Sequence, residues 1–173
     1  SSEQRRLSAR RMEIYAAMLA NMDHHIGRVL DHLRQIGKLD DTLVLFLSDN
    51  GAEFVELASL VEKAFSPQAK QWMDTTFDMR PERWGKKGSV VDYGAAWAQV
   101  GTTPFRLFKA HVTEGGIRAP LIVAGPGVRH RGDVTQALLH VTDIVPTLLE
   151  VAGTTHPSTK PGSTLAALHG KSL

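Results

Sequence analysis

Apolar residues recur at two different spacings along this chain, and each spacing predicts a type of secondary structure. Between residues 10 and 36 they recur every three or four positions, as on one face of an α-helix. Gly37, a residue typical of helix ends, follows this stretch. Residues 43–47 instead form a continuous apolar run, which is the pattern of a buried strand in a parallel sheet. The order of helix, turn and strand is typical of an α/β protein.

The remaining pattern predicts further elements around a long irregular stretch. Residues 74–104 lose the periodicity and are rich in tryptophan, glycine and proline, so they form either a loop that frames a pocket or a region whose tryptophans fill a core. The other expected elements are a helical pattern over 54–73 broken at Pro67, a short strand over 106–112, a buried strand over 120–124, a third strand over 137–139, and a helix over 144–151 capped by Thr142 or Asp143.

Length and composition restrict the class of protein. The chain has 173 residues, of which 42% are hydrophobic and 22% charged, so we expect a single globular domain over 1–173. A net charge of +2 gives no reason to expect nucleic acid or a membrane surface as a partner. No apolar run approaches the roughly 20 residues that span a bilayer. The absence of cysteine excludes disulfides and thiolate chemistry.

Two oxygen-bearing side chains follow directly on the predicted strand over 43–47. Asp49 and Asn50 stand where that strand ends, before Gly51. Ligands of open α/β sheets bind at the carboxyl ends of the strands, and carboxylate and amide oxygens suit Ca²⁺ or Mg²⁺. The same residue types are also common in ordinary turns, so the stretch alone is compatible with a turn or with half of a metal site.

Three motifs follow one another along the chain. They are Ser48-Asp49-Asn50-Gly51, then Tyr93-Gly94-Ala95-Ala96-Trp97-Ala98-Gln99 leading through Thr103-Pro104-Phe105-Arg106-Leu107-Phe108 to Lys109, and finally Glu114-Gly115-Gly116-Ile117-Arg118-Ala119-Pro120. Taken together and in this order, they resemble the sulfatase family, and most closely its bacterial arylsulfatases within the alkaline-phosphatase-like superfamily. Flanking stretches at 15–28 and 143–149 extend the likeness, which covers roughly residues 10 to 170.

The resemblance implies a fold, a reaction and a set of site residues. It implies an α/β fold with a mixed, mostly parallel sheet flanked by helices, and hydrolysis of a small-molecule sulfate ester. Asp49 and Asn50 would bind one divalent cation, Ca²⁺ or Mg²⁺. Lys109 would reach the sulfate and the departing oxygen, a task that suits a compact cation. Trp97 is a further candidate for substrate contact. We expect Glu53, Arg106, Glu114 and Arg118 to form structural ion pairs near the site.

Part of the family pattern has no match in this sequence. The family's nucleophile is a formylglycine made from a Cys/Ser-x-Pro-x-Arg signature, which does not occur here. We therefore expect an internal or C-terminal fragment of a sulfatase that is inactive alone and self-associates through exposed apolar faces. Two alternatives are a phosphodiesterase or phosphonate hydrolase of the same superfamily, and a non-catalytic interaction fragment.

Overall fold

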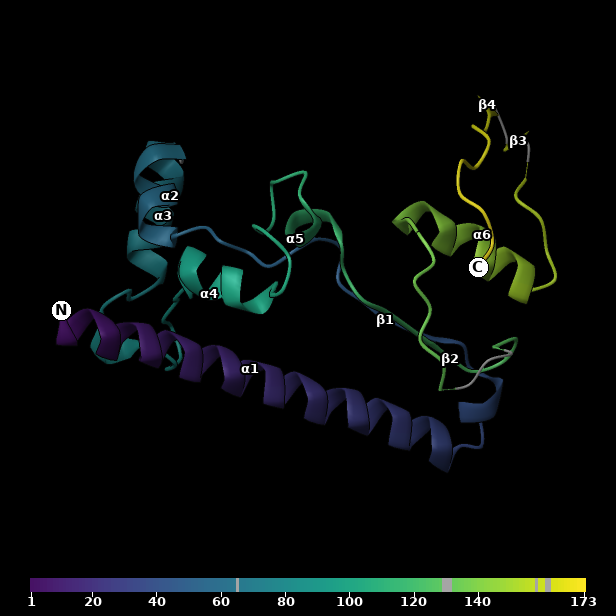
Figure 1. Ribbon diagram of the computed structural model, residues 1–173, viewed down its shortest axis with the longest axis horizontal. Coiled ribbons are helices and arrows are strands. Elements are labelled where there is room, and N and C mark those ends of the chain that lie inside the picture. Colours follow the sequence, from purple (N-terminus) through teal and green to yellow (C-terminus); the bar gives the residue numbers. More distant parts are fainter. Residues whose placement is uncertain (65, 129–131, 158, 161–162) are drawn as a thin grey trace. The chain divides into compact units, whose positions relative to one another are not determined.

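The computed structural model describes the chain except residues 65, 129–131, 158 and 161–162 (Figure 1). The described residues form two compact units. The first comprises Ser1–Gln35 and Asn50–Pro120, and the second comprises Ile36–Asp49 and Leu121–Leu173. The expected single domain over 1–173 stays a prediction.

The first unit begins with a long helix, α1, which spans Ser2–Gln35. The helix starts eight residues before the predicted stretch at 10–36, because its first turns carry charge pairs instead of an apolar stripe. Arg6 pairs with Glu3 at 2.7 Å and Arg10 pairs with Glu13 at 2.9 Å, both at the i,i+3 spacing that supports a helix. None of the residues of α1 is buried, so its apolar stripe is only partly covered.

The predicted break at Pro67 is confirmed, and two helices lie on either side of it. α2 spans Leu57–Ala64 and α3 spans Pro67–Thr76, and the two pack side by side (Figure 1). Ser66 caps α3, since its hydroxyl accepts the backbone N–H of Ala69 at 3.2 Å, and proline at the first helical position suits the fixed φ of that residue. Val61 and Met73 are buried between these elements.

The stretch predicted as irregular, 74–104, is more ordered than its composition suggested. It contains a 3₁₀ turn, η2, at Pro81–Arg83 and a helix, α4, at Gly94–Gly101. Ala98 of α4 is fully buried, and Trp84 is 7% exposed. The indole N–H of Trp84 donates to the carbonyl of Met79 at 2.8 Å, so this tryptophan fills a core.

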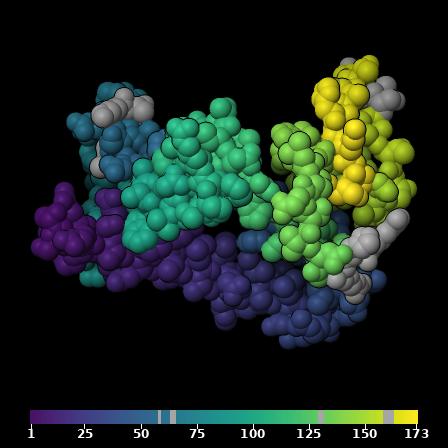
Figure 2. All heavy atoms as spheres, in the orientation of Figure 1, coloured from purple at the N-terminus to yellow at the C-terminus, as the bar shows by residue number. Residues whose placement is uncertain are grey.

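Residues 102–113, which follow α4, contain no strand. The strand expected over 106–112 is therefore wrong. Leu107 and Ala110 have φ of 60° and 69°, in the left-handed region, which interrupts an extended backbone. A short helix, α5, follows at Glu114–Ile117. Atoms of α4 and of this segment form one continuous body of teal and green in Figure 2.

The second unit contains a short 3₁₀ turn, η1, at Leu39–Asp41, and a pair of strands. β1 spans Val44–Leu47 and β2 spans Leu121–Ala124; Val44 pairs with Ala124 and Leu47 with Leu121. The strands lie where the apolar runs predicted them. Their pairing is antiparallel, a direction that the sequence left open because an apolar run does not specify the direction of the partner strand.

Neither strand is buried, in contrast to the prediction. The side chains of Phe46 and Ile122 are 44% and 59% exposed, so one face of the pair has no cover within the described residues. The backbones approach closely at Gly125, where a Cβ would overlap the carbonyl oxygen of Thr42. A larger, mostly parallel sheet stays a prediction.

The predicted last helix is confirmed as α6, Ile144–Val151. A 3₁₀ turn, η3, at Val141–Asp143 precedes it, and Asp143 accepts the backbone N–H of His140 at 2.8 Å. The strand expected over 137–139 is wrong: the backbone there is irregular and Leu138 is 99% exposed. Two-residue strands β3 (Thr159–Lys160) and β4 (Ser163–Thr164) pair antiparallel. Among the described residues, no helix has the length and apolar character needed to traverse a membrane.

Candidate functional site

Backbone hydrogen bonds in the first unit bring parts of the three sequence motifs together. The N–H of Gly51 donates to the carbonyl of Gly116 at 3.0 Å. The N–H of Lys109 donates to the carbonyl of Ala52 at 3.1 Å, and that of Gly115 donates to the carbonyl of Arg106 at 3.1 Å. Segments more than fifty positions apart in the sequence therefore meet here, and we call residues 50–54 with 105–116 the motif junction.

Three glycines make the motif junction possible, because neighbouring backbone atoms come so close to them that a Cβ would not fit. A Cβ at Gly51 would overlap the carbonyl oxygen of Gly115. A Cβ at Gly115 would overlap the carbonyl oxygen of Leu107, and one at Gly116 would overlap that of His111. The Gly-Gly pair in the third motif is therefore explained by close backbone approach.

Lys109 lies on a loop, residues 105–113, that side chains at the end of α4 hold in place. The backbone N–H of Leu107 donates to Oε1 of Gln99 at 2.9 Å, and Nε2 of Gln99 donates to the carbonyl of Phe105 at 2.9 Å. The hydroxyl of Thr102 donates to the carbonyl of Leu107 at 2.9 Å. We call residues 105–113 the Lys109 loop. Gln99 closes the Tyr93–Gln99 stretch of the second motif, but the sequence assigned it no role of its own.

The side chain of Lys109 forms an ion pair with Glu53. Its Nζ lies 2.7 Å from Oε2 of Glu53, and the two side chains are 43% and 46% exposed. The hydrogen bond from the Lys109 ammonium is the main cause that lowers the pKa of Glu53, and the backbone N–H groups of Val55 and Phe54 lower it further. The expected ion pairing of Glu53 is confirmed. That of Glu114 and Arg118 is confirmed as well, since Nη1 of Arg118 lies 3.3 Å from Oε2 of Glu114.

Aromatic rings from both segments of the motif junction contact one another. Phe54 stacks on Phe108 with ring centroids 5.0 Å apart, and the ring of His111 stands edge-on to each of them. Nδ1 of His111 lies 3.2 Å from the carbonyl oxygens of Phe108 and Lys109. Because both neighbours are acceptors, Nδ1 carries the proton, and this fixes the ring against the Lys109 loop. The aromatic cluster thus connects the segment that follows the first motif with the Lys109 loop.

Asp49 and Asn50 have the donor atoms that a hard cation requires, but not enough of them. The chain passes from the second unit to the first between Asp49 and Asn50. Among the described residues, no group of three or more His, Cys, Asp or Glu side chains is placed to hold a metal ion. Calcium takes six to eight oxygen ligands. The donor chemistry fits Ca²⁺ or Mg²⁺, and the assignment of this pair as ligands stays a prediction.

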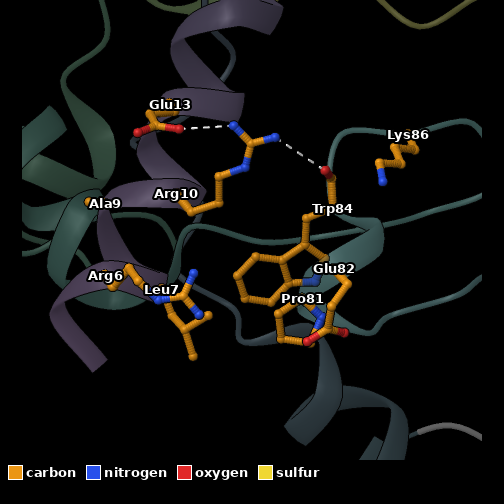
Figure 3. Close-up of a pocket in the computed structure, with 9 residues that line it drawn as sticks. All are labelled: Arg6, Leu7, Ala9, Arg10, Glu13, Pro81, Glu82, Trp84 and Lys86. Atoms are coloured by element: carbon orange, nitrogen blue, oxygen red, sulfur yellow. Dashed lines mark hydrogen bonds and ion pairs between the residues drawn. The ribbon is translucent and has the colours of Figure 1, made fainter. Parts of the chain in front are cut away.

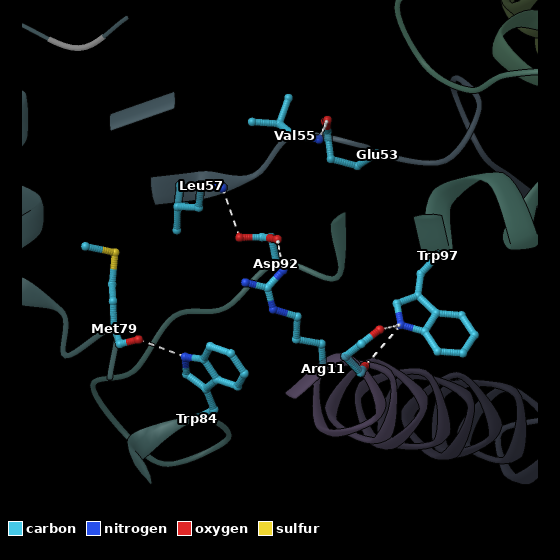
Figure 4. Close-up of polar contacts among 9 residues, drawn as sticks. Arg11, Glu53, Val55, Leu57, Met79, Trp84, Asp92 and Trp97 are labelled. Carbon is cyan, nitrogen blue, oxygen red and sulfur yellow. Dashed lines mark hydrogen bonds and ion pairs between the residues drawn. The ribbon is translucent and has the colours of Figure 1, made fainter. Parts of the chain in front are cut away.

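Trp97 makes a structural contact with α1. Its indole N–H lies 3.0 Å from the carbonyl oxygen and 2.9 Å from the hydroxyl oxygen of Ser8 (Figure 4). This contact connects α4 to the first turns of α1. A role of Trp97 in substrate contact stays a prediction.

A second polar connection joins α1 to the start of α2. Arg11 lies 3.3 Å from Oδ1 of Asp92, and Oδ2 of Asp92 accepts the backbone N–H of Leu57 at 2.9 Å (Figure 4). The guanidinium of Arg11 also lies over the ring of Trp84, 5.2 Å from its centroid. These contacts hold Asp92, the residue before the second motif, between α1 and the start of α2 without any ligand.

A pocket of about 520 Å³ lies between the first turns of α1 and the residues around η2 (Figure 3). Its lining combines cationic, anionic and aromatic side chains, and two of them, Arg10 and Glu13, form an ion pair at 2.9 Å. None of the described residues that line it belongs to the predicted site. The lining residues are Arg6, Leu7, Ala9, Arg10, Glu13, Pro81, Glu82, Trp84 and Lys86.

Comparison with known proteins decides the family. A family model described as Sulfatase matches residues 1–154. The chain belongs to the sulfatase family. It is 42% identical over 160 residues to an uncharacterized sulfatase of Schizosaccharomyces pombe, covering 92% of this chain and 28% of that protein. It is 36% identical over 152 residues to an arylsulfatase of Klebsiella aerogenes, covering 87% of this chain and 31% of that protein.

More distant sulfatases match the same chain. Human N-acetylgalactosamine-6-sulfatase is 28% identical over 144 residues, which cover 83% of this chain and 20% of that protein. The chain thus spans less than a third of the length of these three relatives. The resemblance seen in the motifs is confirmed, and membership of the sulfatase family implies an α/β fold of the alkaline-phosphatase-like type.

Proposed function

We propose that this chain supplies part of the active site of a sulfatase that hydrolyses small-molecule sulfate esters, with aryl sulfates as the first substrates to test. The observation that carries the proposal is the hydrogen bond from the N–H of Lys109 to the carbonyl of Ala52, at 3.1 Å. The bond joins the backbone of Lys109 to Ala52, which lies two positions after Asn50 in the sequence. The lysine proposed to bind sulfate and one proposed metal ligand therefore lie on adjoining segments of the motif junction. The sulfatase relatives support the reaction class.

In this proposal Lys109 binds the sulfate and neutralises the charge that develops on the departing oxygen. Its side chain is 43% exposed, and Glu53 lies beside its ammonium. A cation that is already positioned when charge develops stabilises the transition state without reorganisation, which is usually a large catalytic contribution. The arriving sulfate would exchange with the Glu53 carboxylate as the partner of the ammonium.

Asp49 and Asn50 would hold Ca²⁺ or Mg²⁺ together with ligands from other parts of the intact enzyme. A bound divalent cation supplies positive charge to the sulfate oxygens. Trp97 would stand near the substrate, and β1 with β2 would belong to the larger mixed, mostly parallel sheet of the fold. The formylglycine nucleophile would come from outside this sequence.

The first test is Lys109→Ala in an intact sulfatase that contains this chain. We expect turnover of an aryl sulfate to fall by about two to three orders of magnitude, because the charge on the departing oxygen loses its partner. Lys70→Ala is the matched control, since Lys70 is an exposed lysine in α3. A loss below tenfold for Lys109→Ala contradicts the assigned role.

The second test uses the chain by itself. With Ca²⁺ present, we expect no hydrolysis of an aryl sulfate or an aryl phosphate, because the sequence holds no nucleophile signature. Hydrolysis of the sulfate by the purified chain would refute the expected inactivity. Hydrolysis of the phosphate alone would favour the phosphodiesterase alternative.

A further inference from the structure

The ion pair with Glu53 is too weak to determine where the ammonium of Lys109 lies. Both side chains are close to half exposed, and exposed pairs of this kind contribute about 0–1 kcal/mol. A lysine side chain also retains many rotamers unless its surroundings restrict them. The backbone of the Lys109 loop therefore contributes to where the ammonium lies, because it sets the point from which the side chain extends.

That backbone follows a path that non-glycine residues disfavour. Leu107 and Ala110, on either side of Lys109, have φ of 60° and 69°. The left-handed conformation costs a non-glycine residue about 1–2 kcal/mol, so it persists only where surrounding contacts over-determine it. The contacts that hold Leu107 therefore help to position Lys109, together with the hydrogen bond from the Lys109 N–H to the carbonyl of Ala52.

Gln99 makes two of these contacts with a single side chain. Its carboxamide accepts the N–H of Leu107 and donates to the carbonyl of Phe105, each at 2.9 Å. Thr102, at the end of α4, donates to the carbonyl of Leu107 at 2.9 Å. Both backbone polar groups of Leu107 are therefore bound by side chains from the end of α4, and Gln99 is the one that also binds a second residue of the loop.

We propose that Gln99 is a positioning residue for Lys109: its carboxamide holds the loop in the left-handed turn that places the lysine ammonium beside Glu53. The catalytic consequence rests on the proposed function of Lys109. The positioning itself is a property of this chain and requires neither substrate nor metal, so the two can be tested separately.

The test is Gln99→Met, which keeps the length of the side chain and removes both hydrogen bonds. The carboxyl group of Glu53 reports on the ammonium, because Lys109 is the main cause of its lowered pKa. We expect carbon-13 NMR titration of this carboxyl to show its pKa rising toward the ordinary value in Gln99→Met. Lys109→Met, which removes the ammonium, gives the upper limit of that change.

Thr102→Val and Gln71→Met complete the experiment. Thr102→Val removes one hydrogen bond to Leu107, and we expect a smaller change of the Glu53 pKa in the same direction. Gln71→Met replaces an exposed glutamine of α3 and should leave this pKa unchanged. An unchanged Glu53 pKa in folded Gln99→Met overturns the inference; if that variant does not fold, an unchanged pKa in Thr102→Val overturns it.

Turnover in the intact enzyme separates positioning from the proposed function. We expect Gln99→Met to lower kcat by about ten- to hundredfold through misplacement of Lys109, and to cause no further loss when combined with Lys109→Ala. A further loss of the same size in the Lys109→Ala background overturns the inference that Gln99 acts through Lys109. If Lys109→Ala keeps full turnover while Gln99→Met still raises the Glu53 pKa, the proposed function fails and the positioning stands.

Discussion

The motif junction and the β1–β2 pair are organised in opposite ways. The motif junction has no strand among its described residues, yet its backbone segments contact one another at Gly51, Gly115 and Gly116 with no room for a Cβ. The β1–β2 pair has a regular antiparallel register, yet Phe46 and Ile122 remain exposed. The tight backbone packing of the motif junction thus occurs without a strand, and the β1–β2 pair has a regular strand register while Phe46 and Ile122 stay exposed.

This difference predicts which substitutions will lower the stability of the fold. In the motif junction, a single methyl group at a glycine has no space, because the neighbouring atoms are backbone and cannot rotate away. In the second unit, apolar side chains such as Phe46 and Ile122 are exposed. Substitutions there should therefore affect association of the chain more than its internal packing. Four predictions test this contrast and the difference between the two units, from the largest expected effect to the smallest.

The largest effect concerns the exposed apolar surface of the second unit. We expect the chain alone to form oligomers at micromolar concentration, because the uncovered face of β2 and the exposed side of α6 offer apolar surface. Ile122→Lys and Leu148→Lys, which place a charge on that surface, should shift the chain toward monomer in sedimentation velocity. Gln71→Lys in α3 is the control. A monodisperse wild-type monomer in light scattering would count against this prediction.

The second prediction compares two glycines of the first unit. Gly115→Ala should lower the free energy of unfolding by about 1–3 kcal/mol, because its Cβ would overlap the carbonyl oxygen of Leu107. Gly27→Ala in α1 should instead raise it by up to about 1 kcal/mol, since nothing lies within 4 Å of the added Cβ and alanine favours a helix. Urea denaturation measures both. Equal effects of the two substitutions would remove the distinction between the motif junction and an exposed helix.

The third prediction compares one aspartate from each unit. Two hydrogen bonds from the guanidinium of Arg80, with a third from its backbone N–H, hold the pKa of Asp78 down to about 2. Backbone N–H groups of Lys171 and His140 lower the pKa of Asp143. We expect carbon-13 NMR to show Asp78 titrating at the lower pH, because a charged donor stabilises a carboxylate more than a backbone amide does. The reverse order would contradict this.

The same two groups predict the pH dependence of stability. Because each folded pKa lies below the unfolded value of about 3.9, the charged carboxylates stabilise the folded chain above that pH. Their contribution is lost as the pH falls through the folded pKa, which for Asp78 is about 2. Asp78→Asn should therefore lower the free energy of unfolding at neutral pH and have little effect well below pH 2. Acid unfolding curves followed by circular dichroism measure this, and an equal effect at both pH values would contradict it.

Local patterns in the sequence predicted much of this molecule. The helix stripe found α1, Pro67 marked the break between α2 and α3, and the apolar runs located β1 and β2. The three motifs identified the sulfatase family. These features depend on residues close together in the chain, where periodicity, proline and capping act directly.

The tertiary structure decided the rest. The sequence did not show that β1 and β2 pair antiparallel, because an apolar run looks the same whichever way its neighbour points. It did not show α4 within 94–101, where small residues and glycines hide the helical pattern. It assigned a role to Lys109 through family resemblance but none to Gln99, which it named only as part of a motif, since two hydrogen bonds to an irregular backbone leave no periodic signal. Contacts between distant segments, made by backbone atoms that every residue shares, exist only once the chain has folded.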